Sequence, residues 1–295
     1  MSLEIKVPAS TSNLGAGFDS IGLALELYLE LKVTQAAEWN FYSSSVFLKD
    51  LPAGTDNFIY KIASQVAREF GTEELPPCLI EMKSDIPLAR GLGSSATATI
   101  AGIELADQLL ALKLGENKKL EIATAIEGHP DNVAPSLMGG CVIGHYDSEV
   151  NWVKLPFENV AVVAIIPDFE LKTKTAREAL PRELDYQTSV LASSIANVSV
   201  AAICQQDWEL LGKMMKKDLF HQPYRKALVP HYDELEAYLE TDVYGMFLSG
   251  AGPAIISLVN VSKVKKKLPE WKRDFPGFEW RLLSVDHTGA KVIKT

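Results

Sequence analysis

Two glycines followed by two serines form the first feature that could carry chemistry. The segment reads Pro87-Leu88-Ala89-Arg90-Gly91-Leu92-Gly93-Ser94-Ser95-Ala96-Thr97. Glycine lets the backbone approach a ligand closely, and a helix beginning at the serines would present free amides and the positive end of its dipole to a phosphate. A serine hydroxyl could also ligate magnesium. The segment predicts either a phosphate-binding loop or an ordinary glycine turn before a capped helix, with no preference between the two.

Known nucleotide-binding patterns fit this segment poorly. The sequence G-x-x-x-x-G-K-[ST] does not occur in the chain, which excludes a Walker loop. The dinucleotide-binding pattern nearly fits, with Ala96 at its third glycine position. However, Pro87 and Arg90 stand between the preceding strand and the glycines.

Two further glycine-rich segments could form loops around a ligand. Pro8-Ala9-Ser10-Thr11-Ser12-Asn13-Leu14-Gly15-Ala16-Gly17-Phe18-Asp19 is small, polar and glycine-rich and follows a strand, which suits a loop that lines a substrate. Ser249-Gly250-Ala251-Gly252-Pro253 is a hairpin turn or a second glycine loop over a ligand. Composition alone favours a turn for both segments.

A glutamate and a histidine lie close together in the sequence, between the segment 87–97 and the segment 249–253. Glu121 is in a predicted helix, and His129-Pro130-Asp131-Asn132-Val133-Ala134-Pro135 follows that helix. A helical acid is usually solvated, but one that faces a phosphate loop could hold magnesium. His129 alone is more typical of a turn than of catalysis. None of the five histidines has metal-ligand spacing, so we do not expect a zinc site.

Composition excludes several classes of protein. The 295 residues are 47% hydrophobic and 23% charged, which is typical of a globular protein with one large or two ordinary domains. The 29 Lys and Arg against 38 Asp and Glu give a net charge of −9. A nucleic-acid binder needs a basic face, so we expect no nucleic-acid partner. An anionic ligand must therefore be held by local groups.

The cysteines and the apolar runs indicate the cellular compartment. Cys78, Cys141 and Cys204 are odd in number and far apart, which predicts no disulfide framework and a reducing environment. The N-terminal residues lack the basic and apolar regions of a signal peptide. The longest apolar run, residues 160–166, is too short to cross a bilayer. We therefore expect a cytoplasmic protein with no membrane partner.

Hydrophobic periodicity predicts the elements that must position these loops. Alternating patterns predict strands, and stripes of period 3.6 predict helices. The predicted strands cover residues 3–7, 25–34, 79–82, 139–146, 160–166, 254–259 and 281–285. The predicted helices cover residues 57–70, 94–112, 117–127, 188–204, 207–219, 232–240 and 264–268. Their irregular order favours an α+β fold over a doubly wound sheet, and the charged residues 147–158 are the weakest place to divide the chain.

The order of these motifs resembles that of the GHMP kinase family, which includes galactokinase, homoserine kinase, mevalonate kinase and phosphomevalonate kinase. The segment from Pro87 to Thr97 is similar to the family's P-x-x-x-G-L-G-S-S-A phosphate loop, and Ser249 to Pro253 to its C-terminal glycine motif. Residues 13–19 and 129–135 resemble the homoserine kinase branch in particular. The resemblance covers essentially the whole chain.

The resemblance implies a two-domain α+β fold. An N-terminal ATP-binding domain like domain 2 of ribosomal protein S5 would cover residues 1–155, and a C-terminal ferredoxin-like domain would cover residues 156–295. The implied activity is ATP-dependent phosphorylation of the hydroxyl of L-homoserine to O-phospho-L-homoserine, a step of threonine biosynthesis. ATP would be the co-substrate, Mg²⁺ the cofactor, and relatives suggest a homodimer.

The resemblance also implies a role for individual residues. Ser95 and Glu121 would ligate magnesium. The nucleotide would contact Asn57, Pro87, Leu88, Ala89, Arg90, Gly91, Leu92, Gly93, Ser94, Ser95, Ala96 and Thr97. Homoserine is a zwitterion, and its binding residues would be Asp19, Asp131, Thr173, Arg177 and Arg225. Arginine suits its carboxylate because the guanidinium fork matches two oxygens.

Two asparagines are implied at the reacting hydroxyl. Asn13 would lie near it, and Asn132 occupies the position where sister enzymes such as mevalonate kinase have a basic aspartate. An amide cannot accept a proton at neutral pH. Catalysis would therefore rest on alignment and on charge stabilisation by magnesium and the phosphate loop, and a loose phosphoryl-transfer transition state permits this.

Other functions compete with this interpretation. A kinase for another alcohol, such as mevalonate, would leave the paired acids Asp19 and Asp131 unexplained, because mevalonate has no ammonium group. A catalytically idle ATP-binding regulator on the same fold would be expected to lack Glu121 or the serines, and both are present. A nucleic-acid-binding module is disfavoured by the charge.

Overall fold

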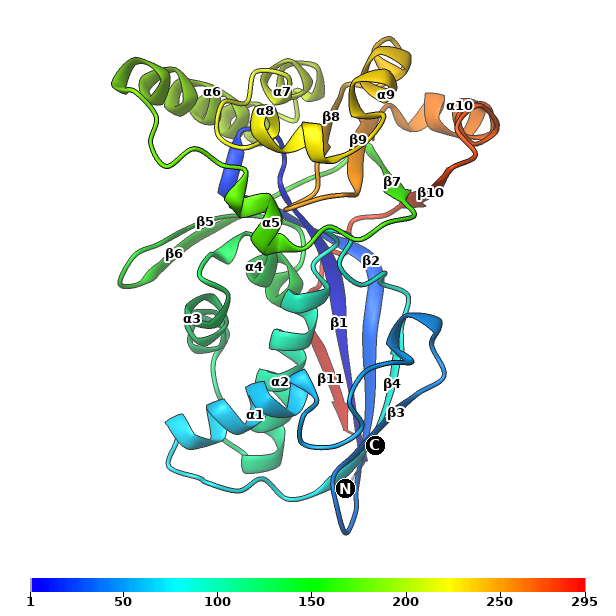
Figure 1. The fold of residues 1–295 in the computed structure, drawn as a ribbon. Helices are drawn as coiled ribbons and strands as arrows, with labels where there is room; N and C mark the ends of the chain where they lie inside the picture. The colour runs from blue at the N-terminus through cyan, green and yellow to red at the C-terminus, as the bar shows by residue number, and fades with distance from the viewer. Residues whose placement is uncertain (1, 295) are drawn as a thin grey trace.

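Two β-sheets with helices packed against them form the molecule (Figure 1). The structure is a computed structural model that describes residues 2–294. The first sheet has the order β11-β1-β2-β4-β3, and β5 adds to β2 and carries β6. Its strands are β1 (Ser2–Asn13), β2 (Gly17–Gln35), β3 (Asn40–Ser43), β4 (Cys78–Ser84), β5 (Cys141–Tyr146), β6 (Val150–Leu155) and β11 (Lys291–Lys294).

The first two strands run much further than their alternating patterns predict. We expected Pro8 to end β1, but the strand continues to Asn13. A shift of register between Pro8 and Ala9 accommodates the proline, as a bulge in a ladder can. The extension matters for the site, because it delivers Ser10, Ser12 and Asn13 beside the phosphate loop.

Four helices pack on one face of this sheet. They are α1 (Phe58–Glu69), α2 (Ser94–Leu110), α3 (Glu116–Glu127) and α4 (Pro130–Met138), and α2 and α4 lie directly on β1 (Figure 1). Asn57 caps α1 by accepting a hydrogen bond from the amide of Ile59, which confirms the predicted start of that helix. Helix α4 was not expected; Pro130 occupies its first turn, where proline needs no amide partner.

The second sheet is antiparallel, with the order β10-β7-β9-β8. Its strands are β7 (Ala161–Pro167), β8 (Gly245–Leu248), β9 (Ile255–Val259) and β10 (Phe278–Leu283). The helices here are α5 (Thr173–Glu178), α6 (Tyr186–Gln205), α7 (Trp208–Met215), α8 (Gln222–Arg225), α9 (Tyr232–Leu239) and α10 (Val261–Asp274). Helices between β7 and β8 and one helix between β9 and β10 give the split βαββαβ arrangement of a ferredoxin-like fold. The expected α+β class and the two parts of the fold are confirmed.

The larger hydrophobic core extends across both parts of the fold. Val162, Ala164 and Ile166 on one face of β7 join the core of the first sheet, whereas Val163 and Ile165 face a second, smaller cluster. The change of sheet falls between β6 and β7, inside the stretch 156–160. The chain then returns, because β11 pairs with β1 in the first sheet. A single division of the sequence therefore does not separate the two sheets completely.

Helix α6 has the length and apolar composition of a membrane span, and within residues 2–294 it is the one helix that does. It packs against α7. Its exposed residues are mixed, with the polar Ser193, Ser194 and Asn197 beside the apolar Val190, Leu191 and Val198.

Candidate active site

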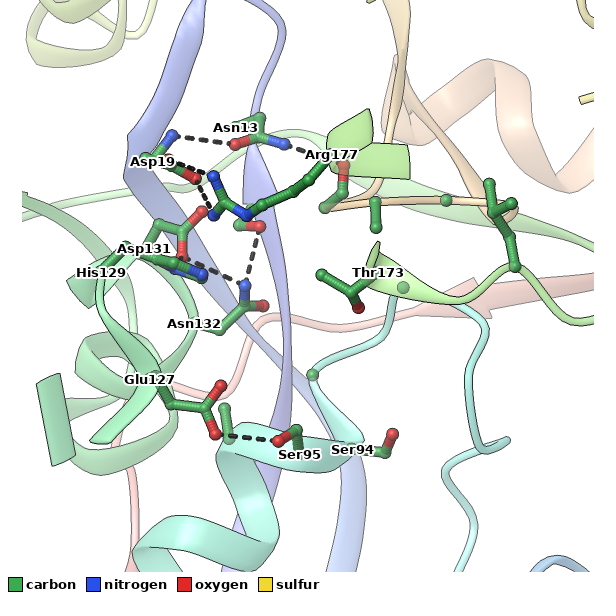
Figure 2. Close-up of a pocket in the computed structure, with 18 of the residues that line it drawn as sticks. Asn13, Asp19, Ser94, Ser95, Glu127, His129, Asp131, Asn132, Thr173 and Arg177 are labelled. Atoms are coloured by element: carbon green, nitrogen blue, oxygen red, sulfur yellow. Dashed lines mark hydrogen bonds and ion pairs between the residues drawn. The ribbon is translucent and has the colours of Figure 1, made fainter. Parts of the chain in front are cut away.

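A pocket lies where the two parts of the fold meet, and Figure 2 shows the side chains that line it. The phosphate loop and the starts of α2 and α4 form one side, and β1, α5 and the glycine loop after β8 complete it. The lining residues are Ser12, Asn13, Asp19, Ala89, Gly91, Gly93, Ser94, Ser95, Ala96, Glu127, His129, Asp131, Asn132, Leu171, Thr173, Arg177, Arg225, Gly250, Ala251 and Gly252. Six segments that are separate in sequence therefore meet at one place.

The predicted phosphate loop has the geometry of an anion-binding helix start. Gly91 and Gly93 have φ angles of +79° and +71°, and α2 begins at Ser94 immediately after them. A Cβ atom on Gly91 would overlap the carbonyl oxygen of Ser249, and one on Gly93 would overlap Ser10. Glycine is therefore required both for the backbone conformation and for the close packing of the loop.

The glycine loop after β8 is bound to the phosphate loop. Ser249 Oγ donates a hydrogen bond to the carbonyl of Gly91 at 2.5 Å. The amide of Ala254 donates to the carbonyl of Arg90 at 3.1 Å. The segment from Ser249 to Pro253 is the turn of the β8–β9 hairpin, as composition favoured, and it is also a loop that lines the pocket.

The remaining residues expected around a nucleotide lie beside the pocket. Thr97, Leu88 and Asn57 line a neighbouring hollow that is mostly apolar and also borders Ser94. Pro87 and Arg90 line a further hollow with Leu88. Leu92 is buried in the core, so only its backbone faces the loop. The Asn57 side chain is bound to the backbone of Pro52 and Ile59, which makes it part of the wall.

Glu121, the expected magnesium ligand, does not face the pocket. Its side chain is 52% exposed and pairs with Lys118 on the outer face of α3. Glu127, six residues further on, is the acid that reaches the phosphate loop. Six residues turn an α-helix by roughly 240°, so the two acids cannot share one face. Glu121 therefore does not lie where the resemblance placed the magnesium ligand, because a position in the sequence does not fix the helix face that a side chain occupies.

Glu127 joins the last turn of α3 to the first turn of α2. Its Oε1 accepts hydrogen bonds from Ser95 Oγ at 2.8 Å and from Thr99 Oγ1 at 2.9 Å. Figure 2 shows the Glu127–Ser95 contact at the edge of the pocket. A carboxylate and a hydroxyl beside free helix amides form an oxygen-rich corner, which is the donor chemistry that Mg²⁺ prefers.

Acids and arginines gather at the other end of the pocket (Figure 2). Arg177 from α5 donates two hydrogen bonds to the carboxylate of Asp19, at 2.9 and 3.0 Å. Arg225 from α8 is buried, and its guanidinium donates to the carbonyls of Ala176 and Gly250. Burial, and then the positive charge of Arg177, lower the pKa of Arg225 to about 10, so the group remains charged at neutral pH.

His129 and Asp131 form a second hydrogen-bonded pair in the pocket. His129 Nδ1 lies 2.5 Å from Asp131 Oδ1. Burial lowers the pKa of His129, but the hydrogen bond and charge of Asp131, with the charge of Asp19, outweigh burial and leave this pKa above its usual value. Sequence analysis treated His129 as a turn residue. Its place in the sequence two residues before Asp131, an expected substrate residue, was the signal available.

The two asparagines lie between the charged end and the phosphate loop. Asn132 donates to Ser12 Oγ at 2.9 Å and accepts from Ser10 Oγ at 3.0 Å. Asn13 donates to the carbonyl of Gly250 at 3.0 Å. Both amides are therefore fixed by hydrogen bonds from or to a neighbouring segment, and both face the pocket.

The structure brings all five of the expected substrate residues together in the pocket. Thr173, at the exposed start of α5, lines the pocket beside the phosphate loop (Figure 2). Glu127, His129 and Ser12 were not assigned from sequence. Ser12 lies within the segment 8–19 that was expected to line a substrate, although it was not named as a binding residue.

Comparison with known proteins defines the class of this fold and site. Residues 57–140 match the model of the GHMP kinases N terminal domain, and residues 199–276 match that of the GHMP kinases C terminal domain. The chain belongs to the GHMP kinase family and is an enzyme of the kinase class.

Within this family the chain belongs to the homoserine kinases. It is 47% identical to a homoserine kinase of Bacillus velezensis over 99% of this chain and 95% of that protein. A structure described as a homoserine kinase from Listeria monocytogenes is 38% identical, has a TM-score of 0.85, and is matched over 99% of this chain and 100% of that one. The homoserine kinase from Cytophaga hutchinsonii gives a TM-score of 0.86 at 29% identity, over 99% of this chain and 97% of that one.

Proposed function

We propose that this enzyme transfers the γ-phosphoryl group of ATP to the hydroxyl of L-homoserine, forming O-phospho-L-homoserine and ADP. The proposal rests on the pocket, because its two ends have different chemistry. One end is a glycine-rich helix start suited to phosphates. The other end presents two acids and two arginines, a set suited to a small zwitterion with an ammonium and a carboxylate group.

At the acceptor end, the charged side chains form two sets, one for each charged group of the substrate. Asp19 and Asp131 are the acids for the ammonium group. Arg177 and Arg225 are the cations for the carboxylate, with Thr173 as a further polar contact. Arg177 and Asp19 form an ion pair with each other. A zwitterion would replace that ion pair with two matched pairs, so that no charge is left unpaired in the partly buried site.

At the donor end, the phosphates would lie on the amides of Gly91, Gly93 and Ser95, and the adenine would enter the apolar hollow that Asn57 and Thr97 line. Ser95 and Glu127 are the residues that would hold Mg²⁺, since both offer oxygen ligands beside the phosphate loop. When bound there, Mg²⁺ would neutralise charge between the β and γ phosphates.

Asn13 and Asn132 are proposed to align the acceptor hydroxyl. Neither amide can accept its proton, and Asp131 already accepts hydrogen bonds from His129 and Asn132. The hydroxyl proton would therefore leave late, to the transferred phosphate. The two asparagines would contribute by orienting the nucleophile for in-line attack. Their side chains are held in place by hydrogen bonds with Ser10, Ser12 and the loop after β8.

The biological setting follows from the same proposal. The product would serve threonine biosynthesis, and the enzyme would act in the cytoplasm.

A homodimer is also proposed. The exposed apolar side chains Tyr186, Val190 and Leu191 of α6 support it, because such groups are often covered by a partner. Light scattering on the eluted protein would measure the mass in solution.

A coupled assay of ADP release tests the function directly. Homoserine, mevalonate, galactose and serine are offered in turn with ATP and magnesium, and the product is identified by mass spectrometry. Turnover with homoserine and phosphohomoserine as product is the expected result. Preference for another alcohol would overturn the substrate, and no turnover with any acceptor would favour an idle ATP-binding protein.

A further inference from the structure

A buried histidine outside the pocket touches two segments that carry substrate-binding residues. His221, the residue before α8, is fully buried. Its Nε2 lies 2.9 Å from the carbonyl oxygen of Gly15. Its ring stacks on Phe18 at a centroid distance of 5.3 Å and an interplanar angle of 18°. One side chain therefore contacts the loop 14–19 at two points.

The protonation state of His221 follows from its partners. The carbonyl oxygen of Gly15 and the buried carboxylate of Asp218, 3.4 Å from Nε2, only accept hydrogen bonds, so Nε2 carries the hydrogen that is donated to Gly15. Nδ1 is buried and has no hydrogen-bond partner, which suits the bare lone pair of a neutral ring. A second proton on Nδ1 would be a buried, unpaired donor, and burial accordingly lowers the pKa of His221.

The loop that His221 contacts has an unfavourable backbone. Asn13, Leu14 and Asp19 have positive φ angles of 76°, 41° and 53°, although none is glycine. Such conformations persist only where neighbouring groups hold them. At Gly15 a Cβ atom would overlap the backbone of Met215, so the loop is packed directly against the end of α7. The neighbours of this loop therefore determine where Asp19 points.

The same histidine also belongs to the segment that carries Arg225. Its backbone carbonyl accepts a hydrogen bond from the Arg225 amide at 3.0 Å. The Arg225 guanidinium lies 5.0 Å from the centroid of the Phe18 ring, and that of Arg177 lies 5.7 Å from it. Phe18 thus lies between His221 and the two arginines at distances typical of cation–π contacts.

We infer that His221 is a positioning residue for the acceptor substrate: through Phe18 and Gly15 it sets Asp19, Arg177 and Arg225 in one arrangement. This inference rests on the proposed function for the identity of the acceptor. His221 does not line the pocket and does not touch the reacting atoms. Its replacement should therefore weaken the binding of the acceptor and leave the nucleotide site intact.

Kinetics of three variants test the inference. His221→Phe keeps a stacking ring but removes the N–H donor, His221→Gln restores a donor, and Phe18→Leu removes the aromatic face. We expect His221→Phe to raise KM for homoserine about tenfold, the order expected for one lost buried hydrogen bond, with kcat and KM for ATP within about twofold. His221→Gln should recover most of the loss. His145→Gln, on an exposed side chain of β5, is the matched control.

The Phe18 variant separates positioning from stability. Phe18→Leu should raise KM for homoserine, and the double variant with His221→Phe should lose less than the product of the single effects, because both changes break one chain of contacts. Unchanged KM for homoserine in folded His221→Phe and Phe18→Leu would overturn the inference, as would equal rises in KM for homoserine and ATP. A wild-type enzyme inactive with homoserine refutes the proposed function instead, and the acceptor it does use then replaces homoserine in this test.

Discussion

Ser95 Oγ donates a hydrogen bond to Glu127 Oε1 at 2.8 Å, which joins the first turn of α2 to the last turn of α3. Thr99, one turn further along α2, donates to the same oxygen. The carboxylate is thus held in one orientation at the phosphate loop while its second oxygen, Oε2, remains available. Glu121 is on another face of α3, so the two acids form a natural pair for comparison.

Glu127→Gln should fold and lose most of its turnover with magnesium and ATP. The amide keeps the shape of the side chain but removes the charge that would bind the metal, and a loss of about 100-fold or more in kcat is expected when a metal site is disrupted. Glu121→Gln should retain wild-type turnover. Steady-state kinetics over a magnesium titration, with circular dichroism to check the fold, measure both variants. Full activity of Glu127→Gln would remove that residue from the metal site.

Gly93→Ala should lose both nucleotide binding and stability. The added Cβ would meet the backbone and hydroxyl of Ser10 at a φ of +71°, and a left-handed conformation alone costs a non-glycine residue about 1–2 kcal/mol. The control is Gly277→Ala, where a Cβ meets nothing within 4 Å. Calorimetric titration with ATP and urea unfolding compare the two variants. An unchanged ATP affinity for Gly93→Ala would mean that the phosphates lie elsewhere.

The fold could be predicted where local periodicity dominates. Helices α1 and α2 and strand β7 begin within about one residue of their predicted positions, because caps and apolar runs mark them in the sequence. Strand β5 was predicted, but its hairpin partner β6 was missed, since β6 lies in the stretch 147–158 that was interpreted as a charged connection and none of its residues is fully buried. Strand β11 was also missed because its pairing with β1 spans the whole chain.

The site was predictable only in part, and for a physical reason. Motifs identify segments that approach a ligand, such as Gly91 to Ser95, because the backbone itself forms that site. They do not fix which face of a helix a side chain occupies, and the error between Glu121 and Glu127 has that origin. No sequence pattern indicates a role for His221, since that role depends on contacts with Gly15 and Phe18, about 200 residues away in sequence.

Acid should weaken the wild-type fold partly through His221. Burial, the largest influence, lowers the pKa of this histidine in the folded state, whereas in the unfolded chain it should be near 6.5. The unfolded chain then binds more protons as the pH falls through about 6.5, so this contribution to stability is lost from there down to the folded pKa, by up to about 1.4 kcal/mol per pH unit. The free-energy difference between wild type and His221→Gln should therefore shrink from pH 7 towards pH 5. A difference independent of pH would contradict a neutral, buried His221.

Replacing Arg177 or Arg225 with alanine should impair the use of homoserine far more than the binding of ATP. Removing one charged partner of a desolvated carboxylate costs about 2–5 kcal/mol, or roughly 30-fold to several-thousand-fold in kcat/KM. The two variants should differ in stability. Arg225 is buried and donates to the carbonyls of Ala176 and Gly250, so its loss should lower the free energy of unfolding, whereas Arg177 is half-exposed and pairs with Asp19 alone.

A cycle that changes the substrate as well as the enzyme decides whether these arginines hold the carboxylate. The amino alcohol that remains when homoserine loses its carboxylate is assayed against wild type and each alanine variant. Removing the carboxylate should cost the wild type as much as removing an arginine, and should add little further loss in the variants, because one interaction cannot be lost twice. A purely structural arginine gives independent penalties for the two changes. Additive penalties at both Arg177 and Arg225 would therefore rule out their contact with the carboxylate and would reopen the identity of the alcohol.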